Sequence, residues 1–477
     1  MLDIMRLHDL AFYIAIFFII GVFIASIAGG YSGKWLAAAF AALAAASFFF
    51  IRGKKEMALM SAVIFAGAAY YFIFDSSQKV TDIPYGKPVT FEAVVRKAEA
   101  TERGQELKVG DVRMYMPALP RFEYGDRVSM EGTILKPEKK LENYFLKEGI
   151  TGVMRYPKVT LLEKDQGSAV MSALFKLKVA VLRTFSEVLP HDEALFLSGL
   201  TLGAKSAFTK EYREMFSRSG TSHLVALSGY NIMVIAGGLA YLLWGWFSRR
   251  VTFILTSLAI FLFVLMTGAE ASIVRAALMG GILLLADQTN RAYSFRNAIS
   301  IVAALMLLEN PRILVYDIGF QLSFAALLGI VYLRPMIRYI FKMKNDNGIF
   351  GWQKNLTTTA AAQAAVLPIL LAEFGTLSLS GLLSNILILQ LIPATMFLGF
   401  SIAILGFFSH YLALGAGYLA HLLLSAELGI IKFFSSFGYA ENVSGFGWGL
   451  AALYYAALVA LTYYYSGKIT DTDEETR

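Results

Sequence analysis

Residues 219–235 read SGTSHLVALSGYNIMVI, an apolar run that opens beside a histidine and is interrupted by Ser-Gly-Tyr-Asn. The run continues into further apolar residues and is long enough to enter a bilayer. Its interruption, however, is poor material for an ordinary spanning helix. Inside a membrane, a broken helix is tolerated only where protein or a watery cavity satisfies the freed backbone groups. The stretch therefore predicts an integral membrane protein with a polar break at a membrane entry point.

The composition of the whole chain agrees with this class. Of its 477 residues, 57% are hydrophobic and only 16% are charged, a balance that ordinary soluble domains do not show. Apolar stretches begin near Leu10, Trp35 and Met57 and recur from His223 to about Tyr465. At about twenty residues for each crossing, we expect roughly eleven to thirteen spans, the first of them retained in the mature chain. The predicted fold class is a polytopic α-helical membrane protein.

A polar insert at residues 75–168 interrupts the apolar stretches. Within it, four segments alternate apolar and polar residues and are rich in Val, Thr, Ile and Tyr, which predicts β-strands. These segments are residues 89–100, 105–117, 126–137 and 152–164, with turns at Arg103-Gly104, Gly110-Asp111 and Gly125-Asp126 and a local helix at 142–149. We expect a small OB-like β-barrel, with a simple β-sandwich as the alternative.

The predicted organisation has five parts. They are N-terminal transmembrane helices (1–74), the β domain (75–168), amphipathic interfacial helices (169–222), a second transmembrane domain (223–466) and a polar tail (467–477). The interfacial helices either form a collar around the entrance to the membrane part or merely cover the spans.

Short basic loops predict the orientation in the membrane. Residues 52–56, 248–250, 287–297 and 334–344 carry most of the loop Lys and Arg, and all four fall on one side when the spans are counted. Cytoplasmic loops are enriched in these residues. We therefore expect a protein of the cytoplasmic membrane with its N-terminus inside and its β domain extracellular or periplasmic.

Residue types exclude several chemistries. The chain has no cysteine, which excludes disulfides, thiolate metal sites and cysteine nucleophiles. Its five histidines are scattered singly, so no metal site and no cofactor are predicted. No Walker A sequence is present, so the chain carries no recognisable ATP motor.

Ionisable and polar side chains inside apolar segments require a reason, because each is costly in hydrocarbon unless paired or hydrated. Glu270 and Arg275 lie one and a half helical turns apart, as a structural ion pair or as the lining of a path for a charged substrate. Asp317 is suited to capping the helix that follows. Gln321 shares its face and Ser323 lies on another, and a lone Gln in a span favours an interhelical hydrogen bond over a substrate contact.

The opening stretch offers two further interpretations. His223, Leu227 and either Tyr230 or Asn231 fall on one helical face, and Ser228-Gly229 can relax the backbone there. A nucleophilic serine is disfavoured, because no GxSxG elbow surrounds either serine and no acid is placed near the histidine. The remaining choices are a polar lining of a conduit or a histidine held by a backbone carbonyl. Asn385, with prolines near it, breaks a second long apolar run and indicates a cavity.

Three segments carry a resemblance to a known family. They are FSRSGTSHLVALSGYNIMVIAG (216–237), GAEASIVRAALMG (268–280) and PRILVYDIGFQLSFAALLGIVYL (311–333). In this order they resemble the competence domain of the ComEC family, whose members form the DNA channel of natural transformation, and the polar insert resembles the family's N-terminal extracellular module. The polar positions of the family correspond here to Ser219, Gly220, His223, Ser228, Gly229, Arg275, Asp317, Gly319, Gln321 and Ser323. Asn231 stands where the family commonly has histidine.

The resemblance implies import of single-stranded DNA through a polar path. On that path Arg275 would meet phosphates, and His223, Asn231, Gln321 and Asn385 would donate hydrogen bonds. The outer module would guide the strand on Tyr115, Phe122 and Tyr124, unless these rings are ordinary core.

The resemblance also implies a set of partners. These are membrane lipids, a DNA receptor outside, a helicase or ATPase inside and a separate nuclease, since no HxHxDH motif is present. Whether one chain or a homodimer forms the pore stays open. The rival hypothesis is a membrane-embedded enzyme that acts on a lipid or cell-wall precursor, with His223, Glu270 and Arg275 around a headgroup.

Overall fold

The computed structural model describes most of the chain. The described residues are 7–28, 48, 52, 55–77, 84–102, 104–138, 142–225, 227, 229–288, 294–343, 352–378, 380–437, 440–442 and 445–475. The span expected from Trp35 and one predicted site residue, Ser228, lie outside the described residues.

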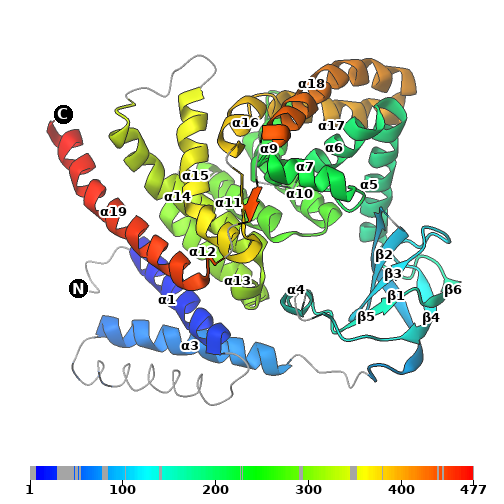
Figure 1. The fold of residues 1–477 in the computed structure, drawn as a ribbon, viewed down its shortest axis with the longest axis horizontal. Coiled ribbons are helices and arrows are strands. Elements are labelled where there is room, and N and C mark those ends of the chain that lie inside the picture. Colours follow the sequence, from blue (N-terminus) through cyan, green and yellow to red (C-terminus); the bar gives the residue numbers. More distant parts are fainter. Residues whose placement is uncertain are drawn as a thin grey trace. The chain divides into compact units, whose positions relative to one another are not determined.

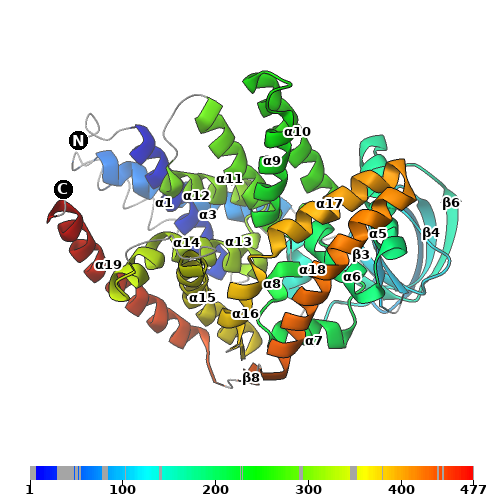
Figure 2. The same cartoon turned by 90° about the horizontal axis from the view of Figure 1, so that it is seen from above.

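The chain divides into two compact units, which Figures 1 and 2 show as ribbons. The first unit comprises Met1–Phe175 and Ile235–Phe320, and the second comprises Lys176–Val234 and Gln321–Arg477. Three helices run from one unit into the other: α5 (Ala169–Val188), α9 (Gly229–Leu243) and α14 (Ile318–Ile340).

The first unit begins with two apolar helices, α1 (Leu7–Ala28) and α3 (Lys55–Ser77), that pack against each other. A Cβ atom at Gly21 would collide with the carbonyl oxygen of Ile64, and one at Gly67 with that of Phe18. Small residues at a helix crossing let two backbones approach closely. The other helices of the unit are α4 (Glu142–Lys147), α10 (Arg249–Thr267), α11 (Ala271–Gln288), α12 (Phe295–Glu309) and α13 (Ile313–Tyr316).

The polar insert folds as a six-stranded mixed sheet in the order β5-β3-β2-β1-β4-β6. Its strands are β1 (Pro88–Thr101), β2 (Gly104–Val109), β3 (Val112–Met116), β4 (Arg127–Thr133), β5 (Gly152–Arg155) and β6 (Lys158–Glu163). All neighbouring strands are antiparallel except β3 and β5, which are parallel. The segment predicted as one strand at 105–117 is a hairpin that turns at Gly110-Asp111.

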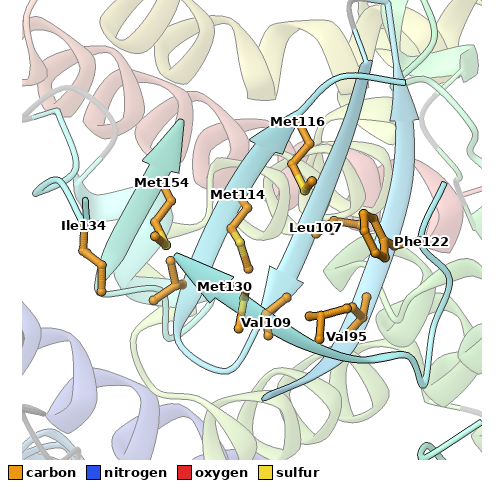
Figure 3. Close-up of a cluster of buried hydrophobic side chains, with 11 residues drawn as sticks. Val95, Leu107, Val109, Met114, Met116, Phe122, Met130, Ile134 and Met154 are labelled. Carbon is orange, nitrogen blue, oxygen red and sulfur yellow. The ribbon is translucent and has the colours of Figure 1, made fainter. Parts of the chain in front are cut away.

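Apolar residues from these strands form one buried core, which Figure 3 shows. Val95, Leu107, Val109, Met114, Val128, Met130 and Met154 are completely buried in it. The alternation read from the sequence is therefore the alternation of core-facing and outward side chains.

The expected barrel is confirmed only as a small mixed sheet. An isolated bridge joins Leu135, just beyond β4, to Val153 of β5, with N–O distances of 2.8 and 2.9 Å. This bridge joins the residue after β4 to the edge strand β5, but one bridge is not a ladder of paired strands. A closed barrel is therefore not shown by the described strands.

The second unit, where its residues are described, consists of helices and one short β pair. Its elements are α6 (His191–Leu202), α7 (Lys210–Arg218), α8 (Ser222–Val225), α15 (Trp352–Phe374), β7 (Thr376–Ser378), α16 (Gly381–Ile388), α17 (Ile392–Phe408), α18 (His410–Phe437), β8 (Ala440–Asn442) and α19 (Trp448–Glu475). Nine of the twelve residues of α6 are buried. This burial argues against α6 as a helix that merely covers the spans.

The helices bear out a multi-pass membrane protein. Within the described ranges, six helices are long and apolar enough to cross a membrane, and a seventh candidate is the pair α16–α17, which is bent by 54°. Two shorter apolar segments lie at Asn231–Leu243 and Ala271–Ala286. The figure of eleven to thirteen spans stays a prediction.

Candidate functional site

The predicted site residues fall into two groups, one in each unit. The group in the second unit surrounds the loop between α7 and α8, residues 219–221. Here the helix ends at Arg218, and Gly220 turns the chain with φ of 70°. The hydroxyls of Ser219 and Thr221, both completely buried, lie 2.7 Å apart. The loop is thus a helix end whose two hydroxyl groups are buried, with Gly220 half-buried between them.

Three serines, which we call the serine clamp, hold this loop. Ser378 and Ser380 both donate hydrogen bonds to the carbonyl of Arg218, at 2.7 and 3.1 Å. Ser384 of α16 donates to the carbonyl of Ser219 at 2.7 Å. The last carbonyls of a helix have no partner within the helix, so the clamp supplies the partners that α7 lacks.

The clamp works because two glycines allow the backbones to meet. A Cβ atom at Gly220 would lie 2.5 Å from the Cα of Gly381, the first residue of α16. The next turn of α16 carries Asn385, whose side chain is only 2% exposed. Its Oδ1 is buried without a hydrogen bond among the described residues. Asn385 and the 219–221 loop therefore belong to one packed region of the second unit, although their role toward a substrate stays a prediction.

His223 and Asn231 both follow the 219–221 loop in sequence but differ in environment. Asn231 is buried and donates from Nδ2 to the carbonyl of Leu200 at 2.6 Å, near the end of α6. This contact gives Asn231 a structural task. His223 lies on α8 with an exposed side chain, and Gly229 begins α9. A role for His223 or Asn231 toward DNA stays a prediction.

We expect Ser384→Ala to lower the melting temperature of the full chain by about 2–4 °C, because it leaves the buried carbonyl of Ser219 without its partner. Thermal unfolding of the detergent-purified protein measures this shift. The matched control is Ser401→Ala, since Ser401 is exposed and bonds only to Phe397 of its own helix. Equal melting temperatures for the two variants would show that the hydrogen bond from Ser384 does not stabilise the protein.

In the first unit, Asp317 joins the membrane helices to the β domain. Its Oδ1 accepts a hydrogen bond from the Phe320 N–H at 3.1 Å, so the predicted cap is confirmed. Its Oδ2 lies 2.9 Å from Nζ of Lys147 on α4, and the side chains of the pair are only 10% and 16% exposed. Asp317 is thus engaged by a cation of this chain.

Two neighbours of Asp317 extend this attachment, which we call the α4 anchor (Asn310, Arg312 and Asp317). Asn310 donates to the carbonyl of Lys147 at 2.8 Å, and Arg312 donates to that of Leu146 at 3.3 Å. Arg312 also pairs with Asp75 at the end of α3, at 2.6 Å. The third family-like segment therefore begins by holding α4 of the β domain.

A cavity of about 360 Å³ lies beside the α4 anchor. Its charged lining consists of Asp75, Arg96, Lys108, Asp111, Glu148 and Arg312. Burial lowers the pKa of Lys108. Three cations face three carboxylates, so this cavity is charge-balanced and does not form a strongly basic surface.

The second family-like segment also lies near the β domain. Gly268 lies in the turn before α11. A Cβ atom added at this glycine would lie 3.9 Å from Cε of Lys97 on β1. Burial lowers the pKa of Lys97, but Glu99 at 2.9 Å, aided by Glu148 and Glu270, outweighs burial and raises it overall. Glu270 precedes α11, and its backbone carbonyl accepts hydrogen bonds from the N–H groups of Ile273 and Val274.

Three further predicted residues lie on α11 and α14. Arg275 lies half-buried on α11 of the first unit. Gln321 and Ser323 lie half-buried in the part of α14 that belongs to the second unit. No group of three His, Cys, Asp or Glu side chains is placed to hold a metal ion in the described part of the chain.

The aromatic residues proposed as a stacking platform belong to the packing of the β domain. Phe122 is 4% exposed in the main core. Tyr115 packs against a second cluster around Phe145. Tyr124 lies 5.2 Å from the ring of Phe175 and accepts a hydrogen bond from the Ser168 N–H. The interpretation as ordinary core is confirmed for Phe122.

Comparison with known proteins places these clusters in a wider context. Residues 200–468, more than half of the chain, match the family described as Competence protein. The chain is also similar to ComE operon protein 3 of Bacillus subtilis (strain 168), with 31% identity over 220 residues. That alignment covers 45% of this chain and 27% of the relative, so most of the relative's length is not matched. No solved structure matches the chain.

Proposed function

The chain belongs to the Competence protein family, and from this membership we propose that it forms a channel that imports single-stranded DNA across the cytoplasmic membrane. The similarity to ComE operon protein 3 of Bacillus subtilis supports the same family assignment. The path itself is our proposal.

The observation that carries the proposal is the packed region of broken helices around the 219–221 loop. A polyanion cannot cross hydrocarbon, so its route must be hydrated and lined by polar groups. Inside a membrane protein, broken helices occur where protein or a watery cavity satisfies their backbone. The clamped loop and the bent pair α16–α17 are such breaks, and both lie in the family-matched residues.

The β domain is proposed to lie outside the cytoplasm and to deliver DNA to the membrane part. Support comes from the α4 anchor, which ties the domain to the start of α14 through Lys147 and Asp317. The four basic loops then face the cytoplasm, with the N-terminus. Directional movement would come from a helicase or ATPase partner inside, and a separate nuclease would degrade the other strand.

Deletion of the gene in its host tests the proposal. We expect deletion to abolish fluorescent DNA that is protected from external nuclease, while DNA bound at the cell surface persists. Complementation with the wild-type chain should restore protection, and Arg275→Ala should restore less than a tenth of it because a half-buried cation in an apolar helix is lost.

Arg183→Ala is the matched control, since this arginine is 79% exposed on α5 and pairs only within its helix. It should complement fully. Unchanged uptake after deletion in a competent host would refute the channel and bring forward the lipid-processing enzyme. Equal failure of both arginine variants would remove Arg275 from the path.

A further inference from the structure

A buried carboxyl group lies in α18 of the second unit, outside every cluster described above. Glu427 is completely buried, on the stripe of α18 that faces its neighbours. The other buried residues of this stripe are Ala413, Gly417, Ala420, Leu424 and Ile431. Because α18 is apolar and long enough to span a membrane, a carboxyl group at its centre is a marker of function.

The surroundings of Glu427 leave its carboxyl group only half satisfied. Thr395 donates from its hydroxyl to Oε1 at 2.7 Å. Oε2 is buried without a hydrogen-bond partner among the described residues. An ionised carboxylate with one hydrogen bond and no cation is very unfavourable in such a place.

In the described part of the chain, the carboxyl group of Glu427 forms a hydrogen bond with Thr395 and no ion pair. The helices α16 and α17, which pack on α18, contain no ionisable residue at all. On α6, the carboxyl group of Glu193 is hydrogen-bonded to His421 of α18, with Oε1 2.8 Å from Nδ1. Glu193 therefore already has a partner. The charged residues of α7, Lys210, Glu211, Arg213, Glu214 and Arg218, make no ion pair with Glu427 in the described structure. A small cation bound to the carboxyl group would neutralise this buried charge.

The position of Thr395 places this carboxyl group at a helix break. Helix α16 ends at Ile388, α17 begins at Ile392, and the two axes differ by 54°. Thr395 lies in the first turn of α17, and its hydroxyl is 3.3 Å from the carbonyl of Leu391. Figure 2 shows α17 and α18 side by side. Broken helices beside a carboxylate are a recurrent arrangement for binding protons and sodium ions.

We propose that Glu427 and Thr395 form a binding site for one exchangeable cation, a proton or a sodium ion, at the break between α16 and α17. With a proton bound, Glu427 donates to Thr395 Oγ1, and the Thr395 hydroxyl turns to the carbonyl of Leu391. With sodium bound, the carboxylate, the hydroxyl and that carbonyl are the oxygen ligands. In either form the buried charge is neutralised and the first turn of α17 is held to α18.

The test measures the melting temperature of the full detergent-purified chain between pH 5 and pH 9, in potassium and in sodium chloride. Glu427→Gln mimics the neutral group and cannot bind either cation by charge. If a proton is bound, wild type and E427Q agree at pH 5, and wild type falls below E427Q by about 4 °C or more at pH 9 in both salts. If sodium is bound, sodium chloride removes that gap at pH 9.

Glu373→Gln is the control, since Glu373 is exposed at the end of α15 and should leave the curve unchanged. Parallel curves for wild type and E427Q in both salts would overturn the site.

If E427Q does not fold, a second measurement tests the site on the wild-type chain. Labelling of wild type by an apolar carbodiimide, which reacts with protonated carboxyl groups, should modify Glu427 in potassium chloride at pH 6. Absence of modification at Glu427 would overturn the site. Neither measurement involves DNA, so a result that overturns the cation site does not contradict the proposed channel.

Discussion

Gly220→Ala is expected to remove most of the folded protein from the membrane. At φ of 70° an L-residue is strained by about 1–2 kcal/mol. In addition, the new Cβ would lie 2.5 Å from the Cα of Gly381, which cannot yield as a side chain could. The 219–221 loop must then move away from α16. The hydrogen bonds from Ser378 and Ser380 to the Arg218 carbonyl and from Ser384 to the Ser219 carbonyl are then stretched or lost, at about 1 kcal/mol each.

Two further glycines separate strain from the close approach. Gly245 has φ of 90° with open space around its Cβ position, so Gly245→Ala carries the strain alone and should accumulate almost normally. Gly381→Ala meets Gln363 Nε2 and the Gly220 backbone at 3.2 Å and should be intermediate. Fluorescence-detected size exclusion of the extracted chain measures the folded amount. Similar amounts for G220A and G245A would show that the glycine contact does not fix the loop.

Local patterns predicted much of the β domain. Period-two alternation located the four segments that carry the strands, but 105–117 and 152–164 each contain two strands, and those of 152–164 lie at opposite edges of the sheet. The turn at Gly110-Asp111 and the helix at 142–147 lie where the residues indicated. These features arise from neighbours in sequence, which the sequence displays directly. Closure of a barrel depends on pairing between distant strands, and here the structure shows only a single bridge.

The clusters themselves could not be predicted, because their contacts join residues far apart in the chain. Ser384 and Ser219 are 165 positions apart, and Lys147 and Asp317 are 170 apart. A polar residue in an apolar segment must be satisfied, but the sequence does not tell whether protein or substrate satisfies it. Asn231 and Asp317 were assigned to a path and are bound by this chain's own groups. Glu427 was missed, since a single acid in a long apolar helix has no motif.

Asp317→Ala is expected to destabilise the attachment of α4 by about 3 kcal/mol or more. It removes the cap on Phe320, worth about 1 kcal/mol, and leaves Lys147 nearly buried without its carboxylate. The nearby ring of Tyr144, 4.8 Å from Nζ, offsets only part of this loss. Amide hydrogen exchange of residues 142–150 should accelerate about a hundredfold or more, while exchange in the strands of the main core stays slow.

Two variants separate the contribution of the Phe320 cap from that of the Lys147–Asp317 ion pair. Asp317→Asn keeps an acceptor for the Phe320 N–H and loses only the charge, so it should fall between wild type and Asp317→Ala. Adding Lys147→Met to Asp317→Asn replaces the unpaired ammonium by an apolar group of similar length, and removing both charges of a buried pair is often nearly neutral. The double variant should therefore exchange more slowly than Asp317→Asn alone. If the two changes instead add, Lys147 and Asp317 are not coupled. The α4 anchor would then rest on Asn310 and Arg312, whose hydrogen bonds to α4 go to backbone carbonyls and do not depend on the charge at position 317.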